Sequence, residues 1–337
     1  MIITLKNATE KLKAAEKILL TAHINPDGDA IGSTLALMQI LRGMKKNVSV
    51  YIDDKLPKNF LTLPCAEEIK RPEENEKISA DLLVVLDTST DRIGKILEMT
   101  DAPILNIDHH VTNKNSEVDL YVESTAAATC EIIFNLAHEL GAEITKDIAV
   151  CLYAGLATDT GFFNYSNTKP ATFRAAAELV EIGVQPNLIA EQVEKRNFRE
   201  VKVMAKALQT TKLYFGGKVV GMFIDLELFK KTDTTEGLID LIRVIDSVDV
   251  AFLLTCHEEK ICRVSMRSKT VNVSDIAKKL GGGGHIRAAG CTIEENFDDA
   301  KKILISAIGE YMIETKKISR EDFELNKEIS LADFEMN

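Results

Sequence analysis

The spacing of apolar residues predicts that strands and helices alternate along the first half of the chain. Buried strands are predicted at 18–20, 48–52, 81–87 and 103–107. The run at 81–87 is almost continuously apolar, which is typical of a strand buried on both faces of a parallel sheet. Helical spacing covers 1–16, the residues after Gly28, and 125–141, 146–158 and 170–183. This alternation predicts an α/β fold with a parallel sheet and flanking helices.

The second half of the chain has a different pattern. Helical spacing from 186 to 210 predicts one long helix, and two hairpin signals follow, around Gly216-Gly217 and around Glu258-Glu259. Further helices are predicted at 234–246, 273–280 and 297–314, with a strand through Cys291. We therefore expect a parallel-sheet domain at 1–185, a helical linker at 186–210, a smaller mixed α/β domain at 211–315 and a charged tail at 316–337. The tail is expected either to be mobile or to dock on a partner.

The composition is that of a globular protein. The chain has 337 residues, of which 45% are hydrophobic and 28% charged, so it is long enough for two domains with their own cores. No apolar run reaches the length of a membrane helix, and the amino terminus lacks a signal-peptide core. We expect a cytoplasmic protein, and a homodimer is compatible with this pattern.

The net charge and the cysteine content exclude some classes of function. The 41 basic and 52 acidic residues give a net charge of −11, which excludes a protein that coats long nucleic acids but allows short anionic substrates. The six cysteines contain no CxxC pair, and we expect buried thiols rather than a zinc site or disulfide bonds. They are Cys65, Cys130, Cys151, Cys256, Cys262 and Cys291.

Acidic and histidine residues follow three predicted strands and one predicted helix, and in a parallel sheet such positions meet at one edge. A lone Asp there is often a turn or cap residue, and Asp29 could simply cap a helix. The joint occurrence favours metal binding, because so many carboxylates would repel one another without cations. Imidazole and carboxylate ligands suit Mn²⁺, with Zn²⁺, Co²⁺ or Fe²⁺ as competitors. A set this large suits two ions, which activate water for attack on a phosphate ester. Its members are His23, Asp27, Asp29, Asp87, Asp108, His109, His110 and Asp159.

Four segments in this order, HINPDGDAIGS, VVLDTS, NIDHHVTN and GLATDTG, resemble the motifs of the DHH phosphoesterase superfamily. VSMRS at 264–268 and GGGGHIRAAG at 281–290 resemble the DHHA1 domain that accompanies one branch. The resemblance implies two Mn²⁺ ions, with Mg²⁺, Co²⁺ or Zn²⁺ as substitutes. It assigns Asp87 as the bridging ligand, His23 and Asp27 to one ion, and Asp29, His109 and Asp159 to the other. Asp108 and His110 are then the implied catalytic residues, with His110 stabilising the transition state.

In the second domain the resemblance implies that substrate is bound by Arg267, His285 and Arg287, with Gly283 and Gly284 close to it. Four consecutive glycines from Gly281 allow close backbone approach and an anion-binding nest, although a flexible loop that ends a helix is the alternative. Relatives often carry a basic residue where this chain has Asn164. One phosphate contact is therefore expected to be lost or to come from another residue.

The implied branch is that of stand-alone bifunctional oligoribonucleases and 3′-phosphoadenosine-5′-phosphate phosphatases. Such enzymes hydrolyse short RNA to mononucleotides and 3′-phosphoadenosine-5′-phosphate to AMP. Hydrolysis of a diadenylate, either pApA or cyclic di-AMP, is the alternative. A non-catalytic nucleotide sensor is less favoured, because none of the six implied metal ligands is missing. The expected partners are short single-stranded RNA or small nucleotides, without long duplexes and without a membrane.

Overall fold

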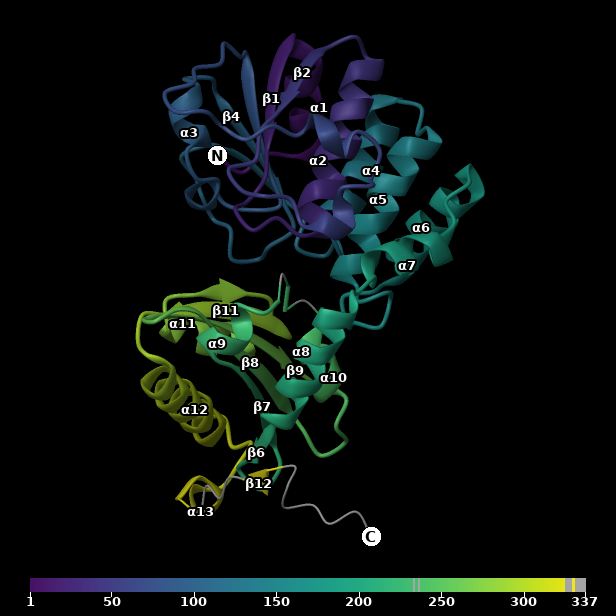
Figure 1. Ribbon diagram of the computed structural model, residues 1–337. Helices are drawn as coiled ribbons and strands as arrows, with labels where there is room; N and C mark the ends of the chain where they lie inside the picture. The colour runs from purple at the N-terminus through teal and green to yellow at the C-terminus, as the bar shows by residue number, and fades with distance from the viewer. Residues whose placement is uncertain (233, 236, 325–328, 331–337) are drawn as a thin grey trace. The chain divides into compact units, whose positions relative to one another are not determined.

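The computed structural model describes residues 1–232, 234–235, 237–324 and 329–330. The chain divides into two compact units, residues 1–195 and 196–337, and each is built on a sheet of its own (Figure 1). Among the described residues, no helix has the length and apolar content needed to span a bilayer.

The first unit contains a five-stranded sheet with the order β2-β1-β3-β4-β5, and every neighbouring pair is parallel. The predicted α/β class with a parallel sheet is therefore confirmed for this unit. Its strands are β1 (Lys17–Thr21), β2 (Asn47–Val50), β3 (Leu82–Leu86), β4 (Ile104–Asp108) and β5 (Asp119–Val122).

Helices cover both faces of this sheet. One face packs against α2, α4 and α5, and the other packs against α3 (Figure 1). The sheet can bury both faces because all five residues of β3 are apolar and buried. The helices are α1 (Leu5–Ala14), α2 (Gly28–Gly43), α3 (Ile96–Met99), α4 (Thr129–Leu140), α5 (Lys146–Asp159), α6 (Pro170–Ile182) and α7 (Pro186–Val193), with short 3-10 turns η1 (Lys58–Phe60), η2 (Ala66–Glu68) and η3 (Thr90–Arg92).

Two features of this half differ from the sequence prediction. The edge strand β5 was not predicted, because only one of its four residues is buried and it has no clear apolar pattern. The helix predicted over 186–210 is divided into α7 and α8 (Phe198–Gln209). Asn197 begins α8 with a capping box, in which its side chain accepts from Glu200 N and the Glu200 carboxylate accepts from Asn197 N. The boundary between the units falls in this break.

The second unit contains a mixed sheet with the order β10-β11-β9-β8-β7-β6-β12, in which only β7 and β8 are parallel neighbours. One face packs against α11 and α12, and the other packs against α8 and α10 (Figure 1). The strands are β6 (Lys212–Tyr214), β7 (Val219–Ile224), β8 (Val250–Glu258), β9 (Ile261–Ser268), β10 (Gly283–Gly284), β11 (Ala288–Ile293) and β12 (Ile329–Ser330). The remaining helices are α9 (Leu226–Phe229), α10 (Leu238–Arg243), α11 (Val273–Lys279), α12 (Phe297–Glu314) and α13 (Arg320–Glu324).

Both predicted hairpins are confirmed, as β6-β7 and β8-β9. In the first, the loop runs over 215–218 and is therefore longer than the predicted two residues. Within it, Phe215, Gly216 and Gly217 have positive φ angles of 53°, 64° and 83°. The helix predicted at 234–246 is shorter, since α10 begins at Leu238, and residue 236 of that range lies outside the described residues.

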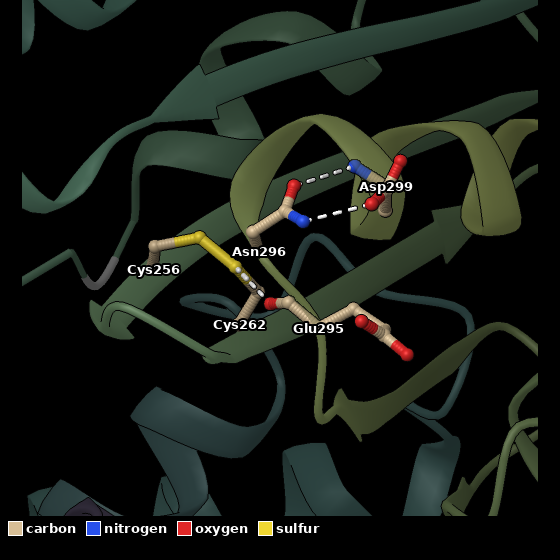
Figure 2. The surroundings of a disulfide bond; sticks show 5 residues. All are labelled: Cys256, Cys262, Glu295, Asn296 and Asp299. Atoms are coloured by element: carbon tan, nitrogen blue, oxygen red, sulfur yellow. Dashed lines mark hydrogen bonds between the residues drawn. A yellow bond between two sulfur atoms is a disulfide. The ribbon is translucent and has the colours of Figure 1, made fainter.

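The expectation that all six cysteines are free thiols is wrong for one pair. Cys256 and Cys262 form a disulfide bond near the turn of the β8-β9 hairpin (Figure 2). The register places these residues opposite each other, with Cα atoms 4.0 Å apart, which is close enough for a bridge. The other four cysteines are free, as predicted, and only Cys65 is not fully buried.

The tail at 316–337 is more ordered than expected over its described part. Residues 320–324 form α13, and the Phe323 ring stacks on Phe215 with centroids 5.7 Å apart. The short strand β12 pairs with β6. Residues 325–328 and 331–337 of the predicted tail lie outside the described residues.

Candidate metal centre and substrate-binding residues

The carboxyl ends of the parallel strands bring the predicted acidic and histidine residues of the first unit together. His23 follows β1, Asp87 follows β3, and Asp108 ends β4 immediately before the two other histidines. The start of α2 and the last turn of α5 contribute the remaining carboxylates. The residues that contact one another across these elements are His23, Asp27, Asp29, Asp87, Asp108, His109, His110 and Asp159.

One group consists of His23, Asp27 and Asp87. His23 Nε2 lies 3.8 Å from Asp27 Oδ2 and 3.6 Å from Asp87 Oδ2. The other ring nitrogen, Nδ1, lies 2.9 Å from the carbonyl oxygen of Ile24, which can only accept a hydrogen bond. Nδ1 therefore donates this hydrogen bond, and Nε2 faces two carboxylates, as in a metal ligand fixed by its second nitrogen.

A second group surrounds His109 and shares Asp87 with the first. His109 Nε2 lies 3.2 Å from Asp159 Oδ2, 3.4 Å from Asp87 Oδ1 and 3.9 Å from Asp29 Oδ2. Burial lowers the pKa of His109, and the neighbouring charge of His110 adds to this effect. A neutral imidazole thus presents Nε2 to three carboxylates. The two oxygens of Asp87 face different groups, Oδ2 towards His23 and Oδ1 towards His109.

Two of the carboxylates also cap helices. Asp27, and not Asp29, is the N-cap of α2, and its Oδ1 accepts hydrogen bonds of 3.0 Å from Asp29 N and Ala30 N. Its Oδ2 is left to face His23. Asp29 is fully buried, and its oxygens accept from Thr129 N and Cys130 N in the first turn of α4, at 2.6 and 2.8 Å. The helix amides stabilise these negative charges without occupying every lone pair.

Asp87 shows that the site fits bound cations. Its side chain is 2% exposed, and its backbone is held in the left-handed region with φ of 60°. Burial raises the pKa of Asp87 well above its usual value, and the charges of Asp29, Asp27 and Asp159 raise it further. Positive charge placed between the carboxylates would remove this conflict. The donor atoms are imidazole nitrogens and carboxylate oxygens without thiolate, which suits a divalent metal.

Asp108 and His110 form a separate pair at the edge of this cluster. Asp108 Oδ1 accepts from His110 N and lies 2.7 Å from His110 Nδ1, and Asp108 Oδ2 accepts from Asn113 at 2.7 Å. Burial alone would raise the pKa of Asp108. The hydrogen bond and the charge of His110 have the larger effect and keep the pKa of Asp108 well below its usual value. Burial likewise lowers the pKa of His110, and Asp108 more than compensates, so the net pKa is raised.

A buried amide network supports the site, and the sequence prediction missed it. The Asn113 side chain donates to Asn106 Oδ1 at 2.8 Å as well as to Asp108, and Asn106 donates to the carbonyls of Val85 and Thr88 at 3.0 and 2.7 Å. On the other side of the site, Thr129 Oγ1 donates to Asp87 Oδ1 at 3.0 Å. The polar Asn106 in the middle of the apolar strand β4 was the signal available in the sequence.

In the second unit, Arg267 and His285 come from neighbouring positions of the sheet. Arg267 on β9 pairs with Ala288 on β11, and the backbones of Ala288 and His285 exchange hydrogen bonds of 2.7 and 3.2 Å. Arg267 Nη1 donates to the Met266 carbonyl at 3.1 Å, whereas the buried Arg267 Nε has no hydrogen-bond partner among the described residues. The predicted substrate-binding residue Arg287 instead donates to the Val271 carbonyl at 3.2 Å.

The glycine run forms a tight hairpin. Gly281 N and Gly282 N donate to the Lys278 and Ala277 carbonyls at the end of α11, so these two amides do not form an anion nest. Gly283 and Gly284 form β10 and pair with β11. Gly284 has φ of 133°, and a Cβ there would lie 2.6 Å from the Ala288 carbonyl oxygen. The glycines therefore allow close strand pairing beside Arg267 and His285.

Asn164 is exposed and lies in the loop after α5. Its side-chain amide donates to the carbonyls of Gly161 and Phe162 at 2.8 and 3.2 Å. These two residues have φ angles of 54° and 52°. The residue holds its own loop in a left-handed conformation and contributes no positive charge.

Comparison with known proteins agrees with this arrangement. The DHH family, N-terminal domain, matches residues 17–156, and the DHHA1 domain matches residues 216–310. The chain is 35% identical over 308 residues to the bifunctional oligoribonuclease and PAP phosphatase NrnA of Thermus thermophilus, covering 89% of this chain and 92% of the relative. It is 28% identical to the protein of the same name from Bacillus subtilis, covering 86% and 93% of the two chains.

The fold also matches a solved structure. The crystal structure of an exopolyphosphatase-related protein from Bacteroides fragilis superposes with a TM-score of 0.80 at 24% identity, covering 91% of this chain and 96% of that one. The two domain matches and the Thermus relative together span most of the sequence. This chain therefore belongs to the DHH family of phosphoesterases, with a DHHA1 domain in its second unit.

Proposed function

We propose that this protein is a two-metal phosphoesterase that hydrolyses short RNA oligonucleotides to mononucleotides and 3′-phosphoadenosine-5′-phosphate to AMP, with Mn²⁺ as its metal. The observation that carries the proposal is Asp87, whose two oxygens face two separate histidine and carboxylate groups. The names of the Thermus and Bacillus relatives supply the substrate class. The net charge of −11 favours short substrates, since a long strand would meet repulsion over much of the surface.

The residues divide between the two ions in the way that their contacts suggest. His23 and Asp27 would hold one ion, and His109, Asp29 and Asp159 the other, with Asp87 shared. When bound, such a pair supplies an activated water for in-line attack and neutralises charge that develops on the phosphoryl group. Asp27 and Asp159 have side chains 45% and 25% exposed, whereas Asp87 and Asp29 are buried, so the substrate would approach from the side of the exposed pair.

His110 is the proposed catalytic residue. Its side chain is 25% exposed beside the metal ligands, and its Nδ1 is engaged by Asp108. Nε2 is therefore the nitrogen that would meet a phosphoryl or leaving oxygen and stabilise its charge. Asp108 is fully buried and is a positioning residue, because Asn113 and His110 occupy both of its oxygens.

We further propose that 1–185 act as the catalytic domain and 211–315 as the substrate-binding domain. Arg267, His285 and the Gly283-Gly284 backbone would contact a phosphate or base of the substrate. Arg267 supports this role because a buried guanidinium nitrogen without a partner among the described residues needs an acceptor. Arg287 would contribute less, because it already donates to the Val271 carbonyl.

The test is a comparison of kcat/KM for a short 5′-phosphorylated RNA, 3′-phosphoadenosine-5′-phosphate and cyclic di-AMP, each with Mn²⁺ and with Mg²⁺. We expect hydrolysis of the first two with Mn²⁺, and mononucleotides as the only products from RNA. Preference for cyclic di-AMP by a factor of ten or more would instead favour the diadenylate phosphodiesterase. Tight binding of all three without turnover would identify a nucleotide sensor and refute the proposal.

A further inference from the structure

We propose that Arg92, which lies outside the metal-ligand set and the DHHA1 motifs, is a substrate-binding residue that holds a phosphate of the nucleotide beside the carboxylate and histidine site. The inference rests on the proposed function, since it names a further contact for the same substrate. It is supported by the position of Arg92, by the way its loop is held and by the absence of another role for its charge among the described residues.

Arg92 lies between two segments that carry proposed metal ligands. It ends η3, five residues after Asp87, and its backbone N donates to the Ser89 carbonyl. Its own carbonyl accepts a 2.9 Å hydrogen bond from Ile24 N, directly after His23. The loop after β3 and the loop after β1 are therefore joined through Arg92, at the edge of the sheet where the site is built.

The loop that carries Arg92 is held at several points. The Thr88 carbonyl accepts from Asn106 and Asn113 at 2.7 and 3.2 Å, and Thr90 Oγ1 accepts from Asn115 at 2.8 Å. Asn113 also donates to Asp108 Oδ2 at 2.7 Å, so one buried amide holds both this loop and Asp108. A rigid loop places a long side chain reproducibly, which substrate binding requires and a merely solvated surface arginine does not.

The guanidinium itself is exposed, and it makes no hydrogen bond or ion pair with another residue that the structure describes. The backbone places this side chain at the edge of the site, because the Arg92 carbonyl accepts from Ile24 N, directly after His23, and Arg92 follows Asp87 by five residues. Arg92 is thus held beside the proposed metal ligands without an ion pair to a carboxylate among the described residues. An arginine in that position is suited to binding two oxygens of a phosphate group.

Neighbouring loops offer few alternatives for this contact. Asn164 is uncharged, and its amide is committed to the carbonyls of its own loop. Lys169 donates its ammonium group to the Thr125 carbonyl at 2.7 Å. Of these three residues, only Arg92 carries a charged group that has no protein partner among the described residues.

The test compares Arg92→Gln, Arg92→Lys and the control Lys13→Gln. Lys13 is an exposed cation near the end of α1, which precedes the amino end of β1 and so lies at the opposite edge of the sheet. KM and kcat are measured with a short 5′-phosphorylated RNA and Mn²⁺, and AMP binding is measured by titration calorimetry under the same conditions. Thermal unfolding of each variant shows whether the fold is intact.

For Arg92→Gln we expect KM for the short RNA and Kd for AMP to rise about tenfold, with kcat within threefold and an unchanged melting temperature. Arg92→Lys should recover part of this loss, because it keeps the charge but not the paired donors. KM and Kd within twofold of wild type in Arg92→Gln, or an equal effect in Lys13→Gln, would overturn the inference. A wild-type protein without turnover would refute the proposed function itself, which is a different result.

Discussion

The candidate sites of the two units differ in the number of buried charged groups and in the structure that holds them. The site of the first unit is dense, with buried carboxylates, imidazoles fixed by carbonyl and carboxylate partners, and amides that lock the loops behind them. The candidate site of the second unit consists of a few side chains beside a tight glycine hairpin. The first region thus holds charge at fixed positions, and under the proposed function the second would bring a backbone and a cation close to a ligand.

Loss of the shared carboxylate should have the largest effect. Asp87→Asn keeps the shape of the side chain but removes the charge that faces both groups, so turnover with Mn²⁺ should fall about a thousandfold or more. The melting temperature of wild type should rise on adding Mn²⁺, whereas that of the variant should rise much less, because ligand binding stabilises only a fold with an intact site. The exposed Asp101→Asn serves as a control. Full activity in Asp87→Asn would contradict the shared-ligand role.

Much of the first site could be predicted, because its residues lie at the ends of strands that the sequence pattern reveals. Apolar runs ending in Asp or His imply parallel strands whose ends meet, and Asp87 and Asp108 lie at such ends. The network around Asn113 was not predictable in this way, because its partners are set by how three loops pack. The break before α8 was visible as the capping pattern Asn197 to Glu200, but the apolar spacing on either side suggested one helix.

In the second unit, the missed features depend on register. Cys256 and Cys262 flank the predicted turn at Glu258-Glu259, and only the pairing of β8 with β9 brings them close enough to form a bond. The glycine run was expected either to approach an anion or to form a flexible loop that ends a helix, and the structure adds that close strand contacts require glycine at Gly282 and Gly284. Strand register depends on tertiary structure. Composition and spacing alone therefore could not decide whether the two cysteines form a bond or what role the glycines have.

The disulfide should stabilise the second unit without contributing to chemistry in the first. The double variant Cys256→Ser with Cys262→Ser should lower the free energy of unfolding by about 2 kcal/mol, because the bond closes a short loop. Turnover at 25 °C should remain unchanged. Urea unfolding followed by circular dichroism measures the loss, and Cys65→Ser, which removes a free thiol of the first unit, is the matched control. Alkylation of all six cysteines in denaturant without reductant would show that the bond is absent.

Substitution of a proposed binding residue of the second unit should change the kinetic constants in a different way from substitution of Asp87. His285→Ala should raise KM for a short 5′-phosphorylated RNA about tenfold while kcat changes little, because it removes a contact to bound substrate rather than a ligand of the reacting centre. Lys260→Gln, an exposed cation in the turn at the far end of β9, should leave both constants unchanged. Steady-state kinetics with Mn²⁺ separates the two constants. An unchanged KM in His285→Ala would remove this residue from the proposed substrate site.

The smallest expected effect comes from a histidine that has no carboxylate partner among the described residues. His257 packs on the Phe229 ring with centroids 4.1 Å apart, and burial, with the nearby charge of Arg263, lowers the pKa of His257 to about 4. The unfolded chain would bind this proton near its ordinary pKa of about 6.5, so this contribution to stability is complete above that pH and is lost as the pH falls towards 4.

Because the ring is only half buried, solvent screening should limit the loss to about 1 kcal/mol. His257→Gln should therefore flatten the decline in melting temperature between pH 6.5 and about 4 without changing kcat at neutral pH. His110 of the first unit behaves in the opposite way, since Asp108 raises the pKa of His110 although that ring is also desolvated. An equal pH dependence in His257→Gln and wild type would show that burial and the charge of Arg263 do not govern the protonation of this residue, and the contrast between His257 and His110 would then fail.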